Sequence, residues 1–377
     1  MANGLFGGGD GTELSPFIVE DAQDLDAVRN NSSASYKQTK SIDLSVYPNW
    51  IPLGDINNNN KFSGSYDGSD LTIDNLTISS TSGSLGLFNN CHSGKIKNVN
   101  IKNANISAAN FQEVGVLAGT LTNTQITECT VSGKVQVLGF FNTVGGLAGV
   151  ITGTSVIKQS AVINSEIKGK YVGGFVGNFT GKLIENCYVT GKVTGYSDNG
   201  SSQVSGFAEN MRYGDIVNCY VSAELTFEHA NEYAALQSPF ANNQGGTITS
   251  CYSDIENKGV EYWKPLFSYS ENTIAKGTDD ELYRCIRMQD AKDYNAGYPF
   301  PPNYPAQPIS GQNWATYWQL ADIHEARNTA QMQTKSNYVD WDFDNIWTIE
   351  EGKSYPIFKL KRAIKKCTRV PLTNYRR

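Results

Sequence analysis

Apolar residues recur along this chain at intervals of about thirty residues. Each copy of a first block places one large apolar side chain among glycine and other small or polar residues, as in GLFN, VLAG, GLAG and GFVG. The large apolar residues are Leu87, Leu117, Leu147, Phe175, Phe207, Phe240 and Leu266. Successive copies are 30, 30, 28, 32, 33 and 26 residues apart, which predicts a stack of similar structural units.

A second block recurs in phase with the first and alternates apolar with polar residues. Its copies read IKNVNI, ITECTV, IKQSAV, IENCYV, IVNCYV and ITSCYS, and a third short run such as GKVQV follows most of them. Alternation with period two is typical of half-buried strands, and the Gly, Asn and Ser residues between runs suit turns. Three strands are too few for a propeller blade, and hairpin signals are scarce. The pattern predicts an all-β fold, a right-handed parallel β-helix (β-solenoid) with about 30 residues per coil.

One slot of the second block is rich in cysteine. From the first copy to the last it holds Val99, Cys129, Ser160, Cys187, Cys219 and Cys251. Equivalent residues of stacked strands lie ~4.8 Å apart, so these side chains are expected to form an inward ladder. Such positions rarely suit disulfide geometry, and the spacing typical of zinc ligands is absent. We therefore interpret the ladder as free, buried thiols that pack as small apolar groups.

The repeat stops short of the N-terminus, where a β-solenoid needs a cap over its open sheet edge. We expect residues 1–16 to form an extended arm and residues 17–83 to form an N-terminal cap with the first, irregular coils. Within this cap, apolar residues recur every third position after Asp21, which predicts a short helix over Asp21–Arg29 with Asp21 as its N-cap.

The regular repeat is expected to occupy residues 84–288. Beyond it, residues 289–358 are predicted to form an irregular C-terminal cap of helix and loop, because their pattern departs from the thirty-residue period. This cap contains a Pro/Tyr-rich loop and a predicted helix from about Ala315 to Thr329. A basic tail, residues 359–377, ends the chain.

Charge is distributed unevenly along the chain. The net charge is −6, but residues 359–377 carry eight basic residues and no acidic one, which leaves −14 on the remainder. A body this acidic argues against a nucleic-acid partner. The longest apolar runs fall far short of the ~20 residues of a membrane span, and the opening MANGLFGGGDG lacks the regions of a secretory signal. We therefore expect no membrane span and no leader.

The blocks GGLAG and VGGFVG, followed by NCYVTGKVTG, resemble the GLUG-type repeat of bacterial surface proteins. That repeat occurs in filamentous-adhesin-like proteins and in the non-catalytic region of bacterial immunoglobulin A metallopeptidases. The opening GDGT-x3-PF, the runs IDLS and FSGSYDG, and the terminal W-x5-W with GKSYPIF are similar to flanking parts of such modules. The resemblance covers roughly residues 7–290 and 338–360, and it implies a stalk or an adhesive module. It does not extend to peptidase chemistry, because HExxH is absent from this sequence.

Residues suited to catalysis are sparse. The three histidines, His92, His229 and His324, have neither metal-ligand spacing nor a nucleophile motif beside them, so we expect no metal and no cofactor. Glycan cleavage needs two carboxylates ~5–9.5 Å apart, which makes a polysaccharide-depolymerising β-helix the serious enzymatic alternative. The candidate acids are Asp67, Asp70 and Asp74, or Glu185 with Asp215 on adjacent coils. Turn positions and solvated outward positions account for these acids more simply than catalysis does, so we predict a non-enzymatic protein.

The C-terminal part carries residue types that are enriched where partners bind. Residues 289–377 contain four of the six tryptophans, among them Trp341 and Trp347. The other two, Trp314 and Trp318, lie with Tyr317 on one face formed by the predicted helix and the residue before it, where they either pack against the solenoid or recognise a partner. The candidate partner-binding residues are Trp314, Tyr317, Trp318, Lys365, Lys366, Arg369, Arg376 and Arg377.

An adhesive module without a leader or an anchor reaches the outside of a cell most simply as part of a virion. We therefore predict a structural component of a bacteriophage particle, a tail spike, fibre or head appendage that attaches to the host surface. Its expected partners are a host-surface glycan or protein, other virion proteins and further copies of itself. The alternative to a virion protein is a bacterial surface adhesin module.

Overall fold

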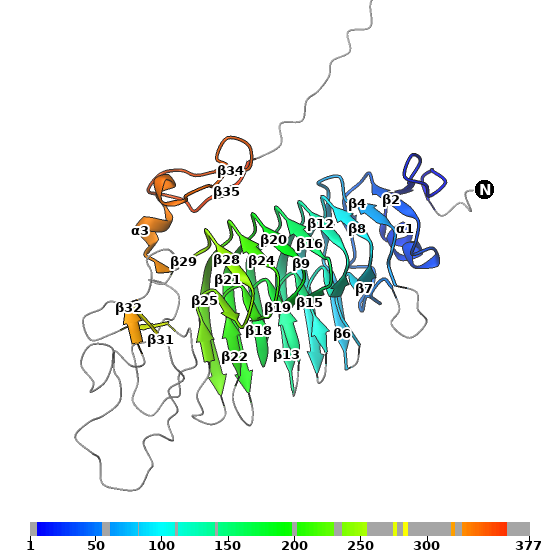
Figure 1. Ribbon diagram of the computed structural model, residues 1–377. Coiled ribbons are helices and arrows are strands. Elements are labelled where there is room, and N and C mark those ends of the chain that lie inside the picture. The colour runs from blue at the N-terminus through cyan, green and yellow to red at the C-terminus, as the bar shows by residue number, and fades with distance from the viewer. Residues whose placement is uncertain are drawn as a thin grey trace, which may run out of the picture.

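The chain folds into a parallel β-solenoid of about six regular turns with about 30 residues per turn, which confirms the predicted fold (Figure 1). The computed structural model describes residues 6–54, 61–81, 83–109, 112–139, 142–197, 202–229, 236–254, 274–276, 282–285, 318–320 and 326–359. Within these residues the coils stack side by side, from the blue N-terminal end to the yellow-green end in Figure 1.

Each regular turn contributes one strand to each of four parallel sheets, which we name sheets A to D. Sheet A runs through β1 (Phe17–Val19), β2 (Ser35–Gln38), β4 (Ser65–Asp67), β8 (Lys95–Lys97), β12 (Gln125–Thr127), β16 (Val156–Lys158), β20 (Leu183–Glu185), β24 (Asp215–Val217) and β28 (Thr247–Thr249). Sheet B runs through β3 (Ile42–Asp43), β5 (Thr72–Asp74), β9 (Asn100–Ala109), β13 (Thr130–Leu138), β17 (Ala161–Gly169), β21 (Tyr188–Ser197), β25 (Tyr220–His229), β29 (Tyr252–Asp254) and β33 (Ala326–Arg327), with β6 (Thr77–Ser80) beside β9.

Two further sheets close each coil. Sheet C consists of β7 (Phe88–His92), β11 (Ala118–Thr122), β15 (Ala148–Thr152), β19 (Val176–Thr180), β23 (Ala208–Met211) and β27 (Ala241–Asn243). Sheet D consists of β10 (Glu113–Val114), β14 (Thr143–Gly145), β18 (Tyr171–Gly173), β22 (Gln203–Ser205) and β26 (Leu236–Ser238). Each coil thus has four sides, where the sequence pattern predicted three strands.

The fourth side is sheet D, and a corner inside the second block also divides that block between sheets A and B. The residue between each sheet A strand and the following sheet B strand has a left-handed backbone, with φ between 47° and 57°. These corner residues are Asn98, Glu128, Gln159, Asn186, Asn218 and Ser250. Asn accepts this conformation more readily than most residues, whereas Glu128 and Gln159 adopt it at a cost that the stacked coils must offset. The block that reads as one strand therefore consists of a short sheet A strand and the start of a longer sheet B strand, which also contains the third run.

The residue after each corner forms the inward ladder that the sequence predicted. Val99, Cys129, Ser160, Cys187 and Cys219 have no exposed surface, and Cys251 is 4% exposed. Where the ladder carries a polar atom, that atom bridges coils: the amide of Cys129 donates to Ser160 Oγ (3.2 Å), and that of Cys187 donates to Cys219 Sγ (3.3 Å). Each thiol or hydroxyl in turn donates to the carbonyl two residues earlier, as Cys219 does to Val217 (3.2 Å). These cysteines are free thiols.

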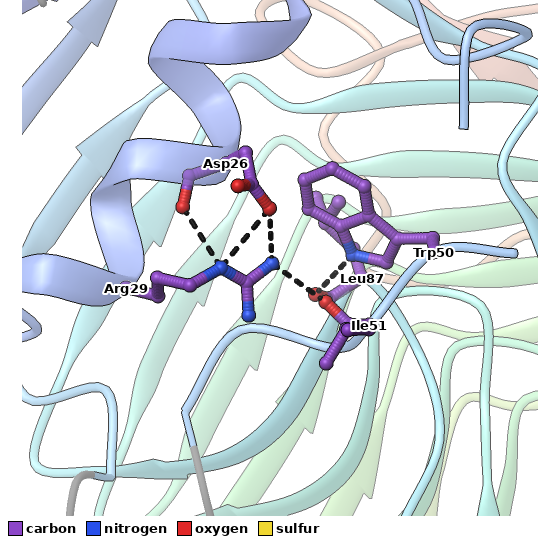
Figure 2. Close-up of polar contacts among 5 residues, drawn as sticks. All are labelled: Asp26, Arg29, Trp50, Ile51 and Leu87. Atoms are coloured by element: carbon purple, nitrogen blue, oxygen red, sulfur yellow. Dashed lines mark hydrogen bonds and ion pairs between the residues drawn. The ribbon is translucent and has the colours of Figure 1, made fainter.

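A short helix covers the N-terminal end of the stack, as predicted. Helix α1 (Ala22–Ala27) continues into the 3₁₀ turn η1 (Val28–Asn30), and the Asp21 side chain caps it by accepting from the amides of Gln23 (2.9 Å) and Asp24 (3.0 Å). Figure 2 shows how this cap is fastened to the first coils. Arg29 donates to Asp26 and to the carbonyl of Ile51 (3.0 Å), and its guanidinium lies 5.6 Å from the ring of Trp50.

Trp50 continues this fastening into the core. Its side chain is 1% exposed, and its indole Nε1 donates to the carbonyl of Leu87 (3.3 Å), as Figure 2 shows. The N-terminal arm lies against the same end of the stack. Phe6 stacks on Phe17 with their ring centroids 4.7 Å apart, and the amide of Gly7 bonds to the carbonyl of Ile18 (3.0 Å).

The prediction of a helix from about Ala315 to Thr329 is wrong. Trp318–Leu320 is strand β32, which pairs antiparallel with β31 (Leu282–Cys285), and β31 pairs in turn with β30 (Ile274–Lys276). The next helix, α3, is a single turn over Thr329–Met332 with Asn328 as its N-cap. Aromatic side chains favour strands, and here the pairing with β31 outweighs the helical spacing of the aromatic residues.

One residue breaks the pattern of the core. Glu209 occupies the sheet C position that Gly119, Gly149 and Gly177 fill in earlier coils, and it is only 5% exposed. A Cβ atom added at Gly149 would lie 2.5 Å from the backbone nitrogen of Val114 in sheet D, so this position has little room. Burial raises the pKa of the Glu209 carboxyl to about 8, and the nearby charge of Arg212 offsets only part of that effect.

We expect the Cys219→Ser variant to fold and the Cys219→Asp variant to be too unstable to fold. Serine reproduces the bridging hydrogen bonds, as Ser160 already does, so the loss of unfolding free energy should be about 1–2 kcal/mol. A carboxylate in the same place would be buried between two coils at a cost of several kcal/mol. Urea unfolding with circular dichroism measures both variants. Equal stability of the two variants would contradict the buried ladder.

The carboxyl of Glu209 should make the unfolding free energy fall as the pH rises from about 5 to about 8. Glu209→Gln should remove this contribution. The folded-state pKa of Glu209 lies above its ordinary value of 4.5, so between these pH values only the unfolded state ionises. The slope is on the order of −1.4 kcal/mol per pH unit. Urea titrations at about pH 5 and pH 8.5 should show Glu209→Gln stabilising only at the higher pH.

The exposed Glu224→Gln is the matched control for this experiment. Glu224 pairs with Lys192 at 3.5 Å on the outer face of sheet B, so its replacement should shift stability little, and by a similar amount, at both pH values. If Glu209→Gln behaved in the same way, the carboxyl of Glu209 would be ionised in the folded protein.

Candidate functional site

A groove of about 480 Å³ lies on the outer face of sheet A near its N-terminal end. Its floor is formed by two columns of outward-facing residues on strands β2, β4, β8 and β12. The first column is Ser35, Ser65, Lys95 and Gln125. The second column is Lys37, Asp67, Lys97 and Thr127. Because parallel strands stack in register, each column runs along the solenoid axis.

The N-terminal arm supplies one wall of this groove through Glu13 and Pro16. The amide of Ser35 donates to the carbonyl of Gly11 (2.8 Å), which holds the arm against β2. From there Glu13 reaches Lys95 on β8, with Nζ and Oε1 3.2 Å apart. The arm therefore extends beside three strands of the sheet.

The floor carries more positive than negative charge. Asp67 lies between Lys37 and Lys97 in its column and pairs with Lys97 at 3.2 Å. Partial burial favours the neutral form of Asp67, but hydrogen bonds from Asn98 (2.9 Å) and the Ser69 amide (2.9 Å), together with Lys97, lower its pKa overall. Asp67 is therefore an ionised carboxylate.

The groove lacks the features of a glycosidase site. A general acid needs a raised pKa, whereas that of Asp67 is lowered. Glu185 lies four strands further along sheet A, or ~19 Å away, and pairs with Lys158 at 2.8 Å. Asp215 is opposite Leu183 rather than Glu185.

The other two candidate acids also have structural surroundings. Asp70 is a turn residue with φ of 60°, and the Asp74 carboxylate accepts from the hydroxyl of Thr72 (2.5 Å). Among the described residues, no three His, Cys, Asp or Glu side chains come together as a metal site would require. His92 is a half-buried residue on β7, while the side chain of His229 and the whole of His324 lie outside the described part.

The predicted partner-binding residues are not brought together by the described structure. Of these, only the backbone of Trp318 is described, as the start of strand β32. The rest lie outside the described residues: Trp314, Tyr317, Lys365, Lys366, Arg369, Arg376 and Arg377.

Trp341 and Trp347, which the sequence suggested for partner binding, pack against the protein's own solenoid instead. Residues 326–359, which we call the strap, lie along the flank of the last coils (orange to red in Figure 1). Trp341 is 7% exposed and Trp347 is fully buried. Their indoles donate to two corner residues, Trp347 to Asn186 Oδ1 (3.2 Å) and Trp341 to the carbonyl of Ser250 (3.0 Å).

Three tyrosines on the outer face of sheet B receive the strap. Tyr188 and Tyr220 stack with ring centroids 5.0 Å apart, and Tyr252 follows in register. The hydroxyl of Tyr220 donates to the carbonyl of Pro356 (2.7 Å). In the earlier coils the same column holds Asn100, Thr130 and Ala161. This change from small or polar residues to tyrosine within one repeat position is the signal that could have predicted a covered face.

No helix among the residues that the structure describes is long and apolar enough to cross a membrane.

Comparison with known proteins identifies the repeat. The family model described as the GLUG motif matches residues 168–194, which run from the end of β17 into β21. Halomucin of Haloquadratum walsbyi is 33% identical over 172 residues, covering 42% of this chain and 2% of halomucin. A protein named as a Gly-rich membrane protein of Evansella cellulosilytica is 35% identical over 106 residues, covering 26% of this chain and 12% of that protein. The chain thus matches only a small part of each relative.

A solved structure supports the fold independently. The crystal structure of a Bacteroides ovatus protein named as an immunoglobulin A1 protease aligns with a TM-score of 0.59, covering 95% of this chain and 96% of that one. At 19% sequence identity this likeness concerns the fold alone. The chain is a β-solenoid that contains a GLUG motif.

We expect Trp347→Ala to detach the strap. The change removes a fully buried indole from the tyrosine stack, at a cost of roughly 3–5 kcal/mol. Hydrogen exchange should show loss of protection in residues 326–359, while sheet C amides stay protected. Ile357→Ala, at a side chain that is 49% exposed, is the control and should change little. Unchanged protection in Trp347→Ala would show that the strap is held elsewhere.

Proposed function

We propose that the chain is a non-catalytic, rigid adhesive module of a cell-surface or secreted protein. The observation that carries this proposal is the unbroken parallel ladder of sheet A, in which nine strands from β1 to β28 are joined edge to edge. A stack of this kind has one shape and no internal hinge, as a spacer or a presenting surface requires.

The outer face of sheet B also supports the proposal of a rigid module. One of its columns alternates in charge from coil to coil, with Lys134 near Glu166 (3.6 Å) and Lys192 near Glu224 (3.5 Å). Exposed pairs like these contribute about 0–1 kcal/mol each. These pairs instead help to specify which coils are neighbours, because a coil displaced by one position in the stack would place like charges opposite each other.

The names of the relatives that share the repeat, a halomucin and a Gly-rich membrane protein, support a place at the cell surface or outside the cell. They favour the bacterial surface adhesin alternative over the virion component that we expected from the sequence. The virion role draws no support from these likenesses.

Rigidity is tested by the distance between two spin labels on one column of sheet A. Lys37→Cys and Val217→Cys lie six strand spacings apart, so the labels should report a narrow distribution near 29 Å. Cys285→Ser and Cys367→Ser are included in all samples, and the buried native thiols should stay unlabelled. A broad or bimodal distribution would contradict a rigid module.

The polysaccharide depolymerase is the second candidate because Asp67, although its pKa is lowered, is an acidic residue in the groove. On our proposal, incubation with a panel of polysaccharides should release no reducing ends and no unsaturated sugars. Release that disappears in Asp67→Asn, but persists in the control Asp215→Asn, would establish the depolymerase instead.

A further inference from the structure

We propose that the groove on sheet A binds an anionic glycan, a polysaccharide whose sugars carry carboxylate or sulfate groups, laid along the solenoid axis. The proposal specifies the ligand of the adhesive module and in that sense rests on the proposed function. It concerns a site of about 480 Å³, which lies within the usual size range of pockets for small organic ligands.

The first argument is charge. Three lysines from two strands, Lys37 of β2 and Lys95 and Lys97 of β8, face the groove, whereas Glu13 and Asp67 are its only acidic lining residues. Lys95 and Lys97 pair with these two carboxylates, and Lys37 has no ion-pair partner among the described residues. The lining therefore has a surplus positive charge although the protein as a whole carries −6. A local field opposite to that of the whole molecule selects anionic ligands.

The second argument is the kind of group that the floor offers. Ser65, Gln125 and Thr127 supply hydroxyl and amide groups beside the lysines, a set that suits sugar hydroxyls as well as acidic groups. The two tyrosines of the lining point into the core, Tyr36 being 1% exposed and Tyr66 fully buried, so no aromatic ring is offered for stacking on a neutral sugar. The affinity of the groove for a glycan must then come mainly from the charges of its lysines.

The third argument excludes an added peptide strand. Each strand of the floor is already paired on both sides, β4 with β2 and β8, and β8 with β4 and β12. A peptide that binds by strand addition needs an open edge, and the floor presents none. The floor also lacks apolar pockets that would select peptide side chains, since its outward residues are polar or charged.

The wall of the groove is expected to take part in binding. Glu13 is 74% exposed on its side chain, and its pair with Lys95 is of the surface kind that contributes little to stability. An acidic sugar can therefore displace Glu13 from Lys95. In the unliganded protein Glu13 acts as a competitor for the same cation.

The experiment measures binding of fluorescent oligogalacturonate to the full chain by polarisation, beside its methyl ester, which has the same sugars without the charge. Oligogalacturonate should bind with an affinity that falls with salt, and the ester should not bind. Lys37→Gln and Lys95→Gln should each weaken binding about fivefold, whereas Glu13→Gln should strengthen it by a similar factor.

Lys182→Gln is the control, because it removes the same charge from an exposed lysine that does not line the groove. Oligosaccharides of dextran sulfate, which carry sulfate but no carboxylate, separate sulfate from carboxylate as the preferred group. Equal losses of affinity in Lys37→Gln and Lys182→Gln would place the binding site elsewhere. Tighter binding of polyglutamate than of either glycan would make the ligand a peptide. No binding of any of these anions would overturn the proposal. Each of these outcomes leaves the spin-label distance unaffected, so a failure of the ligand and a failure of the rigid module are distinguishable.

Discussion

Hydrogen bonding between equivalent residues of successive coils is the constraint on which the rest of this structure depends. Each coil is too thin to have a core of its own, so it buries its apolar side chains only by aligning them with those above and below. Ile96, Ile126, Ile157 and Ile184 pair in register along sheet A and face inward for this reason. A substitution at one such position therefore acts on three coils at once.

The same constraint explains which polar groups the core accepts. Cysteine and serine both occur in the inward ladder because their side chains can accept an amide hydrogen from the preceding coil and donate to a carbonyl two residues back. Valine fits at Val99 because the amide of Leu71, the equivalent residue of the preceding coil, donates to the carbonyl of Gly68 (2.9 Å) and needs no acceptor from the ladder. Glu209 lies outside this ladder, on sheet C, and burial of its carboxyl raises its pKa.

The period, the inward ladder and the N-terminal helix could be predicted from the sequence because each depends on local spacing that repeats. Sheet D was missed because its strands are two or three residues long and show no alternation, as at Glu113–Val114. The prediction of a C-terminal helix is wrong because the spacing of three aromatic residues fits a helix by chance. Pairing with a strand distant in sequence makes Trp318 part of a strand instead. The groove was missed because Glu13 and Lys95 are 82 residues apart in sequence and meet only when the arm crosses the sheet.

Outward-facing columns are where this scaffold is free to vary, since stacking dictates only the inward side chains. On the outer face of sheet B, the column that begins with Asn100 ends in tyrosines, and those tyrosines are covered by the strap. On the outer face of sheet A, the column that begins with Lys37, Asp67 and Lys97 ends in Val217 and Thr249. The first change has a visible cause, because the chain itself occupies the aromatic end. The charged end of sheet A is bordered by the N-terminal arm through Glu13 and Pro16, and we propose that an anionic ligand from outside occupies the groove beside that arm.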